Sequence, residues 1–203
     1  MKKIIVMLAA LVCPILLYAA DNDALLAKIE SACSKLASAQ ASFTHVRTTA
    51  AKTSVTQEGT MYFQAPGKLS MVYDADLFVI NGDNVYIRRG GKVNRFDTSK
   101  VPSMKGLSAT LTLGMAGKIK EIAETNNALY NIEDGAKEYK VTIAARAKAP
   151  RGYSRIVMTF RKSDCMVTSL ETTEFNGMVN SYTLAGFSKN VPVDDSVFAI
   201  PEK

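Results

Sequence analysis

The sequence has few of the residues from which metal centres and disulfide scaffolds are built. It holds three cysteines and one histidine in 203 residues, with no CxxC pair. These counts exclude a disulfide-rich scaffold, a zinc ribbon and a thioredoxin motif, and they argue against a His-rich metal centre. Tryptophan is absent, and 12 glycines and 6 prolines are too few for a collagen-like or low-complexity chain. We therefore expect an ordinary folded domain with no metal and no cofactor.

Long apolar runs are also missing, except at the start of the chain. Lys2 and Lys3 give the chain a basic start, residues 4–17 are apolar, and small residues end at Ala20 before a polar stretch. This order is typical of a secretory signal peptide, and 14 apolar residues fall short of the roughly 20 that span a membrane. We expect residues 1–20 to be a signal peptide, cut at Ala20 or one residue earlier, and residues 21–203 to form a single domain.

The net charge of +6 at first suggests nucleic acid as a partner. Loss of Lys2 and Lys3 with the signal peptide leaves +4, and export disfavours nucleic acid further. A basic cluster remains around one expected hairpin. Such a cluster could meet phosphate or an anionic membrane surface, and we favour a solvated edge that discourages aggregation. Its members are Arg88, Arg89, Lys92 and Arg95.

The cysteines leave one question open. Cys13 follows Val12 rather than a small residue, so a lipid anchor at Cys13 is not predicted. Cys33 and Cys165 remain in the mature chain, and they could pair in an oxidising compartment or stay as two buried thiols.

Two segments have helical periodicity. The first covers about residues 21–40, where one apolar stripe predicts an amphipathic helix. That stripe consists of Leu25, Ile29, Cys33 and Leu36. The second covers residues 106–125, where Gly114 and Gly117 weaken the pattern and predict a short or bent helix.

Alternation with a period of two predicts strands in most of the remaining chain. Before the second helical segment the expected strands are 41–49, 59–65, 68–73, 77–80, 84–88 and 93–97, and after it they are 128–133, 139–145, 154–161, 166–175 and 178–187. Short turns such as Asn176-Gly177 make this an antiparallel meander, followed by an irregular tail. So many antiparallel strands must curl into a barrel or half-barrel, with the helices available to cover its open side.

Catalytic motifs are not evident, and we expect no enzyme. Gly114–Lys118 lacks the hydroxyl residue that a phosphate loop needs, because Ile119 follows it. His45 has no acid nearby in the sequence, and we interpret it as structural. A hydrolase whose paired carboxylates meet only in the fold remains the more distant alternative.

The chain is instead rich in flexible apolar side chains, including seven methionines after the signal peptide. Methionine suits surfaces that re-pack around variable apolar ligands. Alternation places Met61, Phe63, Leu69, Met71 and Tyr73 on the concave face of the curled sheet, opposite Ile29, Cys33, Leu36, Leu111 and Met115 of the helical segments. From patterning alone, these residues indicate a filled core.

Several segments, taken in order, resemble the periplasmic outer-membrane lipoprotein carrier family, LolA. They are 41–44 (ASFT), 57–66 (QEGTMYFQAP), 68–73 (KLSMVY), 78–86 (FVINGDNVY) and 193–198 (VDDSVF). The resemblance implies a mainly β fold of the α+β class, an incomplete antiparallel β-barrel with helices covering its concave apolar face. Members carry the acyl chains of lipoproteins through the periplasm, from an inner-membrane ABC transporter to an outer-membrane receptor.

The resemblance also implies where lipid would bind, and we expect a monomer with no catalytic residues. Positions similar to the family's cavity are Leu69, Met71, Tyr73, Cys33 and Leu36, and the set sharing that space adds Met61, Phe63, Ile29, Leu111 and Met115. The family usually has Arg before the Pro of its second segment, where it holds the lid shut, and this chain has Ala65. The alternative function is an exported module of the same fold that binds or senses another lipid or glycolipid.

Overall fold

The computed structural model describes residues 13–149 and 151–200, and within them one antiparallel sheet of 11 strands forms the body of the molecule. The first six strands are β1 Ser38–Thr48, β2 Ser54–Gln64, β3 Lys68–Tyr73, β4 Leu77–Asn81, β5 Asn84–Arg89 and β6 Lys92–Asp97. The other five are β7 Ala128–Asp134, β8 Glu138–Ala145, β9 Tyr153–Arg161, β10 Val167–Glu174 and β11 Val179–Lys189. Every strand expected from the sequence is present.

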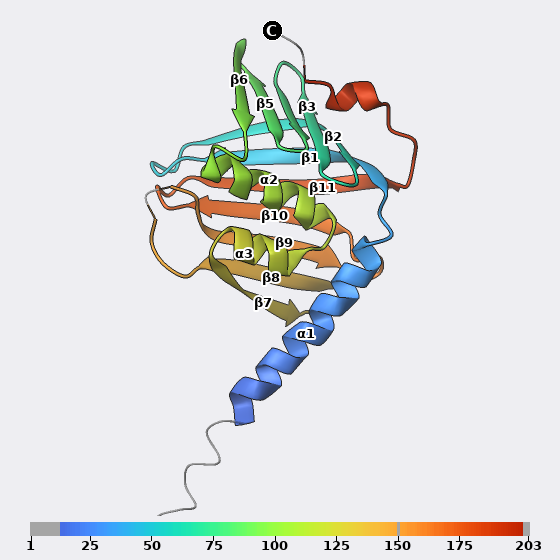
Figure 1. Ribbon diagram of the computed structural model, residues 1–203, viewed down its shortest axis with the longest axis vertical. Coiled ribbons are helices and arrows are strands. Elements are labelled where there is room, and N and C mark those ends of the chain that lie inside the picture. The colour runs from blue at the N-terminus through green and yellow to red at the C-terminus, as the bar shows by residue number, and fades with distance from the viewer. Residues whose placement is uncertain (1–12, 150, 201–203) are drawn as a thin grey trace, which may run out of the picture.

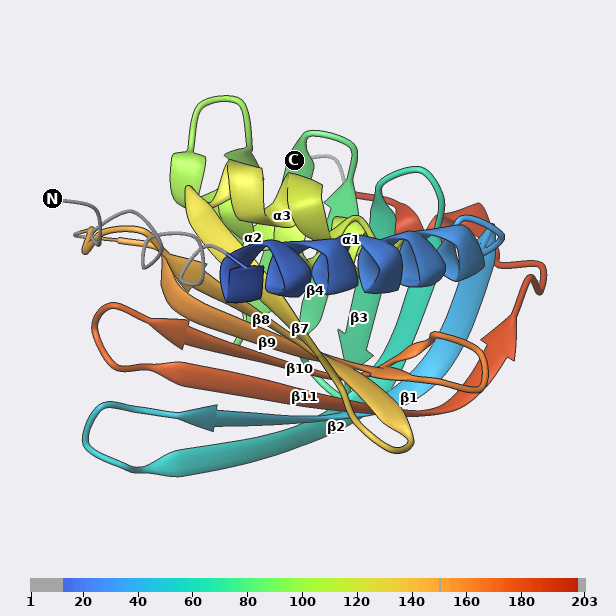
Figure 2. The ribbon, with the colours of Figure 1, turned by 90° about the horizontal axis from the view of Figure 1, so that it is seen from below.

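The strand order is β6-β5-β4-β3-β2-β1-β11-β10-β9-β8-β7. Each half of the chain is a meander of neighbouring hairpins, and β1 joins the halves by pairing with β11. Because β6 and β7 lie at opposite ends of this order, the sheet curls without closing (Figures 1 and 2). The expected incomplete antiparallel barrel is confirmed.

In the described ranges three α-helices accompany the sheet: α1 Cys13–Cys33, α2 Pro102–Met115 and α3 Ile119–Thr125, and a short 3₁₀ helix, η1 Asp195–Phe198, lies in the tail. Figure 1 shows α2 and α3 in front of the sheet, and Figure 2 shows α1 on the same side of it, so the helices cover one face. None of the helices in the described part of the chain combines the length and apolarity that a membrane crossing needs. Residues 1–12 of the expected signal peptide lie outside the described residues, and 13–20 are the first turns of α1.

The first helix differs from its expected bounds, because it ends at Cys33 rather than near residue 40. After it, the amide side chain of Asn190 accepts a hydrogen bond from the Ala37 N–H at 2.8 Å and donates one to the Lys35 carbonyl at 3.1 Å. These contacts hold the backbone in a turn that leads directly into β1. Leu36 is therefore buried in this turn and not on the helix.

The second helical segment is two helices rather than the one short or bent helix expected over residues 106–125, and it begins earlier, at Pro102. α2 and α3 are separated at residues 116–118, where Gly117 has a φ of +69°. A Cβ at Gly117 would lie 2.9 Å from the Cβ of Cys33, so this turn packs closely on the end of α1.

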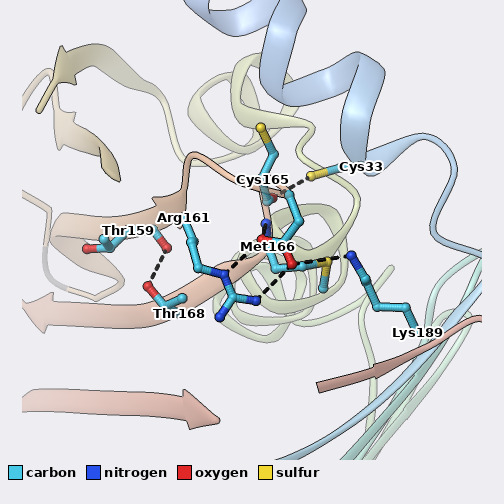
Figure 3. A network of polar contacts seen from close by, with 8 residues as sticks. Cys33, Thr159, Arg161, Cys165, Met166, Thr168 and Lys189 are labelled. Atoms are coloured by element: carbon cyan, nitrogen blue, oxygen red, sulfur yellow. Dashed lines mark hydrogen bonds and ion pairs between the residues drawn. The ribbon is translucent and has the colours of Figure 1, made fainter. Parts of the chain in front are cut away.

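The turn between β9 and β10 meets the same corner of the molecule (Figure 3). Arg161 donates two hydrogen bonds to the carboxylate of Asp164, at 2.9 and 2.8 Å, and Lys189 of β11 lies 3.2 Å from it. The Cys33 thiol donates to the carbonyl of Cys165 at 3.2 Å. Both cysteines are free and buried in this structure, so α1 is held here by packing and this contact.

Candidate functional site

A half-open cavity of about 330 Å³ lies between the concave face of the sheet and α2. This volume is at the lower end of the roughly 300–1,000 Å³ usual for small-ligand pockets. Its apolar wall consists of Met71, Leu77, Phe78, Ile87, Met104, Leu107, Leu111, Tyr153, Leu170 and Met178. The wall thus combines strands from both halves of the chain with the buried side of α2.

A smaller, almost wholly apolar space of about 30 Å³ continues the cavity beneath the C-terminal half of α2. The two spaces share Met71, Thr110, Leu111, Leu170 and Tyr182. The smaller one is completed by Met61, Leu69, Gly114, Met115, Met158, Val167 and Leu184. Methionine side chains are flexible, so this inner end can change shape around an apolar ligand at little cost.

The structure divides the ten residues expected at a lipid site into two groups. Six line the two spaces, and they are Met61, Leu69, Met71, Tyr73, Leu111 and Met115. The other four, Ile29, Cys33, Leu36 and Phe63, are buried in the core away from both spaces. The sequence therefore places residues on the correct face but does not separate core from cavity.

Polar groups gather at the outer end of the cavity, around His45. The Tyr73 hydroxyl lies 3.1 Å from His45 Nδ1, and Asn180 Oδ1 lies 3.2 Å from Nε2. The ring of Tyr182 stacks on the imidazole with centroids 4.2 Å apart. Burial lowers the pKa of His45 and raises the pKa of Tyr182 to about 12, so both side chains favour their neutral forms.

The structural role expected for His45 agrees with its contacts to Tyr73, Asn180 and Tyr182. The signal that could have placed it in the cavity wall is its register on β1. It faces the same side of the sheet as Phe43, and it pairs with Tyr182 of β11. The rim carboxylate of Asp76 accepts hydrogen bonds from the Gly90 N–H and the Gln57 side chain and not from the imidazole.

Charged side chains complete the rim of the cavity. Arg47, Arg88 and Arg89 are the cations, and Asp76 and Glu174 are the anions. Asp76 lies 3.8 Å from the Arg89 guanidinium, and the Gly90 N–H is the main cause of its lowered pKa. Within residues 13–149 and 151–200, no three His, Cys, Asp or Glu side chains gather closely enough to hold a metal ion.

The helix α2, which covers the cavity, meets its neighbours through small residues. A Cβ at Gly114 would lie 2.9 Å from Met158 Cε, and one at Gly106 would lie 2.8 Å from Asn126 Oδ1. The first turn has no side-chain N-cap and no acidic residue, and the Val101 N–H before it donates to the Asp97 carbonyl at 3.1 Å. Ala65 stands where the family usually has the Arg that holds the lid. Its side chain is exposed, and its N–H donates to the Ala37 carbonyl at 2.9 Å.

Comparison with known proteins points to one family. The family described as "Outer membrane lipoprotein carrier protein LolA" matches residues 34–201, which is most of the chain. Among curated proteins, no sequence match was found.

Two solved structures share the fold at low sequence identity, and a third is similar at a lower TM-score. An uncharacterized conserved protein from Thermus thermophilus is 9% identical, with a TM-score of 0.53 over 90% of this chain and 95% of its own. A Desulfovibrio piger protein from a family of unknown function is 11% identical, with a TM-score of 0.50 over 90% and 97%. A LolA superfamily protein from Nitrosomonas europaea is 9% identical, with a TM-score of 0.44 over 88% and 97%.

Proposed function

The chain belongs to the outer membrane lipoprotein carrier family LolA, and we propose that it carries the acyl chains of lipoproteins in the cavity beneath α2. On this proposal the protein works in the periplasm as a monomeric binding protein and not as an enzyme. It receives acylated lipoproteins from an inner-membrane ABC transporter and passes them to a receptor at the outer membrane.

The observation that carries the proposal is an apolar space left open inside the curled sheet. Protein interiors are normally close-packed, and voids of this size are rare in a core. Here the space continues from the open rim to Met115 and Met158 without a charged side chain in its inner part. Such a space suits a hydrocarbon chain, which gains about 0.8 kcal/mol for each methylene removed from water.

The size of the cavity bears on how loading takes place. If a methylene occupies about the volume of one liquid water, roughly 30 Å³, an acyl chain of about 14 methylenes needs about 400 Å³. The cavity of about 330 Å³ therefore has room for about one chain. Three chains require α2 to move away from the sheet, and we infer that this helix is the lid.

The structure of α2 is compatible with such a movement. Its N-terminal end lacks a side-chain cap, and its C-terminal end leads into the turn at Gly117. Thr110 and Thr112 satisfy their hydroxyls within the helix, on the carbonyls of Gly106 and Ser108. These hydroxyl groups need no new partner when the helix shifts as a rigid body.

Two neighbouring residues of β3 provide the experiment. Met71 lines the cavity and is 3% exposed, whereas Val72 points to the other face of the sheet and is 38% exposed. Met71→Glu places a carboxylate against the acyl chain, and Val72→Glu makes the same change in charge outside the cavity. We expect purified Met71→Glu to lose lipoprotein binding and Val72→Glu to bind as the unchanged protein does.

Leu69→Glu is a second cavity variant, because Leu69 lines the inner space and is 1% exposed. Circular dichroism on all three variants establishes that they fold. Normal lipoprotein binding by both folded cavity variants would contradict the proposal. Binding of other lipids in place of acylated lipoprotein by the unchanged protein would favour the related lipid- or glycolipid-binding module.

A further inference from the structure

The concave face changes from apolar to polar along the length of its strands. On β1 the residues facing the cavity side run from Phe43 through His45 to Arg47. Their partners on β11 are Leu184, Tyr182 and Asn180, which show the same change. The inner end of the cavity is therefore hydrocarbon-like, and its outer end offers cationic and hydrogen-bonding groups.

Two arginines reach this outer end from opposite walls. Arg47 lies on β1, and Arg89 ends β5, which is four places along the strand order. Both line the same cavity because the sheet curls over itself. The positive charges of both arginines also act to lower the pKa of His45 and of Tyr182, which line the same cavity.

The anions of the rim do not neutralise Arg47. Asp76 lies beside Arg89 at 3.8 Å and accepts hydrogen bonds from Gly90 and Gln57. The other rim carboxylate, Glu174, accepts a hydrogen bond from Asn176. Among the residues that the structure describes, Arg47 forms no ion pair, although its side chain is half-buried.

A half-buried guanidinium without an anion is tolerable only while water reaches it. A ligand whose acyl chain fills the cavity displaces that water and leaves the charge poorly solvated. A ligand whose polar end is anionic replaces the water with a charge-assisted, bidentate contact. The rim thus distinguishes among ligands with the same hydrocarbon chain.

We propose that the cavity binds single acyl ligands whose polar end is a phosphate or carboxylate, with the acyl chain against Met71 and Leu111 and the anion between Arg47 and Arg89. This inference rests on the proposed function in one respect, that an acyl chain occupies the cavity. It goes beyond it because the triacylated end of a lipoprotein does not require an anion at this position.

Ligands with one matched chain and different polar ends test the proposal. Palmitate carries a carboxylate, palmitoyl-lysophosphatidylglycerol carries an anionic phosphate, palmitoyl-lysophosphatidylcholine is zwitterionic, and hexadecanol is neutral. Dissociation constants are measured by calorimetry with the purified protein, below the concentration at which each ligand forms micelles. We expect both anionic ligands to bind at least about 10-fold more tightly than hexadecanol. Inorganic phosphate alone should show no detectable binding.

The arginine variants assign the preference to residues. Arg47→Gln with Arg89→Gln removes both charges, and we expect it to abolish the preference, with hexadecanol binding at least as tightly as to the unchanged protein because no cation is left to desolvate. Arg47→Lys keeps the charge and should keep most of the preference. Arg155→Gln is the matched control, because Arg155 is exposed on β9 and faces away from the cavity side that Ile156 occupies.

Equal affinity for palmitate and hexadecanol would overturn this inference and leave the proposed function standing. A preference that survives in the double variant would also overturn it, since the anion would then bind elsewhere. If no ligand with a palmitoyl chain binds, the acyl cavity itself is wrong, and the proposed function fails with the inference. If palmitate binds more tightly than hexadecanol but palmitoyl-lysophosphatidylglycerol does not, the rim does not accept phosphate, and that half of the proposal is refuted.

Discussion

A larger side chain at Leu111 distinguishes a hollow core from a filled one. Leu111 lines both parts of the cavity from α2 and is 8% exposed, whereas Leu36 is 6% exposed and lies outside both spaces. Replacing either leucine by tryptophan makes the same chemical change, and the two side chains are buried to almost the same degree. Leu111 lies beside the cavity on a helix, and Leu36 lies in a turn with neither space beside it.

The expected effects follow from volume. An indole in place of the leucine side chain adds about 60 Å³, roughly twice the share of one liquid water. The cavity beside Leu111 holds about 330 Å³, so the ring enters existing space. We expect Leu111→Trp to change the free energy of unfolding by no more than about 1 kcal/mol, because the ring buries apolar area. Leu36→Trp overpacks a filled region and should cost about 1–3 kcal/mol.

Thermal unfolding and ligand binding together provide the assay. For a chain of this length, each kcal/mol shifts the melting temperature by about 2–4 °C. Leu111→Trp should keep the melting temperature and lose affinity for palmitoyl ligands, because the ring occupies their space. Leu36→Trp should lower the melting temperature and keep the affinity of the folded fraction. Equal destabilisation by both changes, with binding unaffected in Leu111→Trp, would refute the hollow core.

The remaining predictions concern stability. Burial lowers the pKa of His45 below its usual 6.5, so the unfolded chain binds this proton more readily. Stability should be complete above pH 6.5 and fall as the pH drops below it, and His45→Gln should flatten this dependence in urea titrations. Hydrogen bonds from the Arg161 guanidinium lower the pKa of Asp164 to about 2 from 3.8, a contribution of up to about 2 kcal/mol that is present above pH 3.8 and lost toward pH 2. Asp164→Asn should lower the free energy of unfolding by about that much at pH 7 and by much less at pH 2. An equal loss at both pH values would contradict this role of the Asp164 carboxylate. Gly117→Ala combines a φ of +69° with a Cβ 2.9 Å from Cys33 Cβ, whereas Gly82→Ala has a φ of +57° and no atom within 4 Å. Gly82→Ala should cost about 1 kcal/mol from backbone strain and Gly117→Ala clearly more, measured as the free energy of unfolding.

The sheet could be predicted because its signals are local. The bounds of β3, for example, are those expected at 68–73, since alternation runs between a Pro-Gly break and an acidic turn. The end of the first helix could not be predicted, because Leu36 continues the apolar stripe at helical spacing. The turn that follows the helix is held by the side chain of Asn190, which lies 153 residues from its partner Ala37 in the sequence.

The cavity was predicted in part for a similar reason. Alternation identified Leu69 and Met71 as residues of the concave face, and it assigned Phe63 to the same face although Phe63 lies in the filled core. A period of two gives the face of the sheet but not the position along it where the core ends. His45 and Asn180, 135 residues apart, meet only through the pairing of β1 with β11.

Mass spectrometry of the ligands that co-purify with the protein from the native envelope tests the central claim most directly. The protein is isolated under mild conditions, its bound molecules are extracted, and Met71→Glu is treated in the same way as a control. We predict that acylated lipoproteins accompany the unchanged protein and are absent from Met71→Glu. Recovery of no acylated lipoprotein, or of equal amounts from both proteins, would contradict the account.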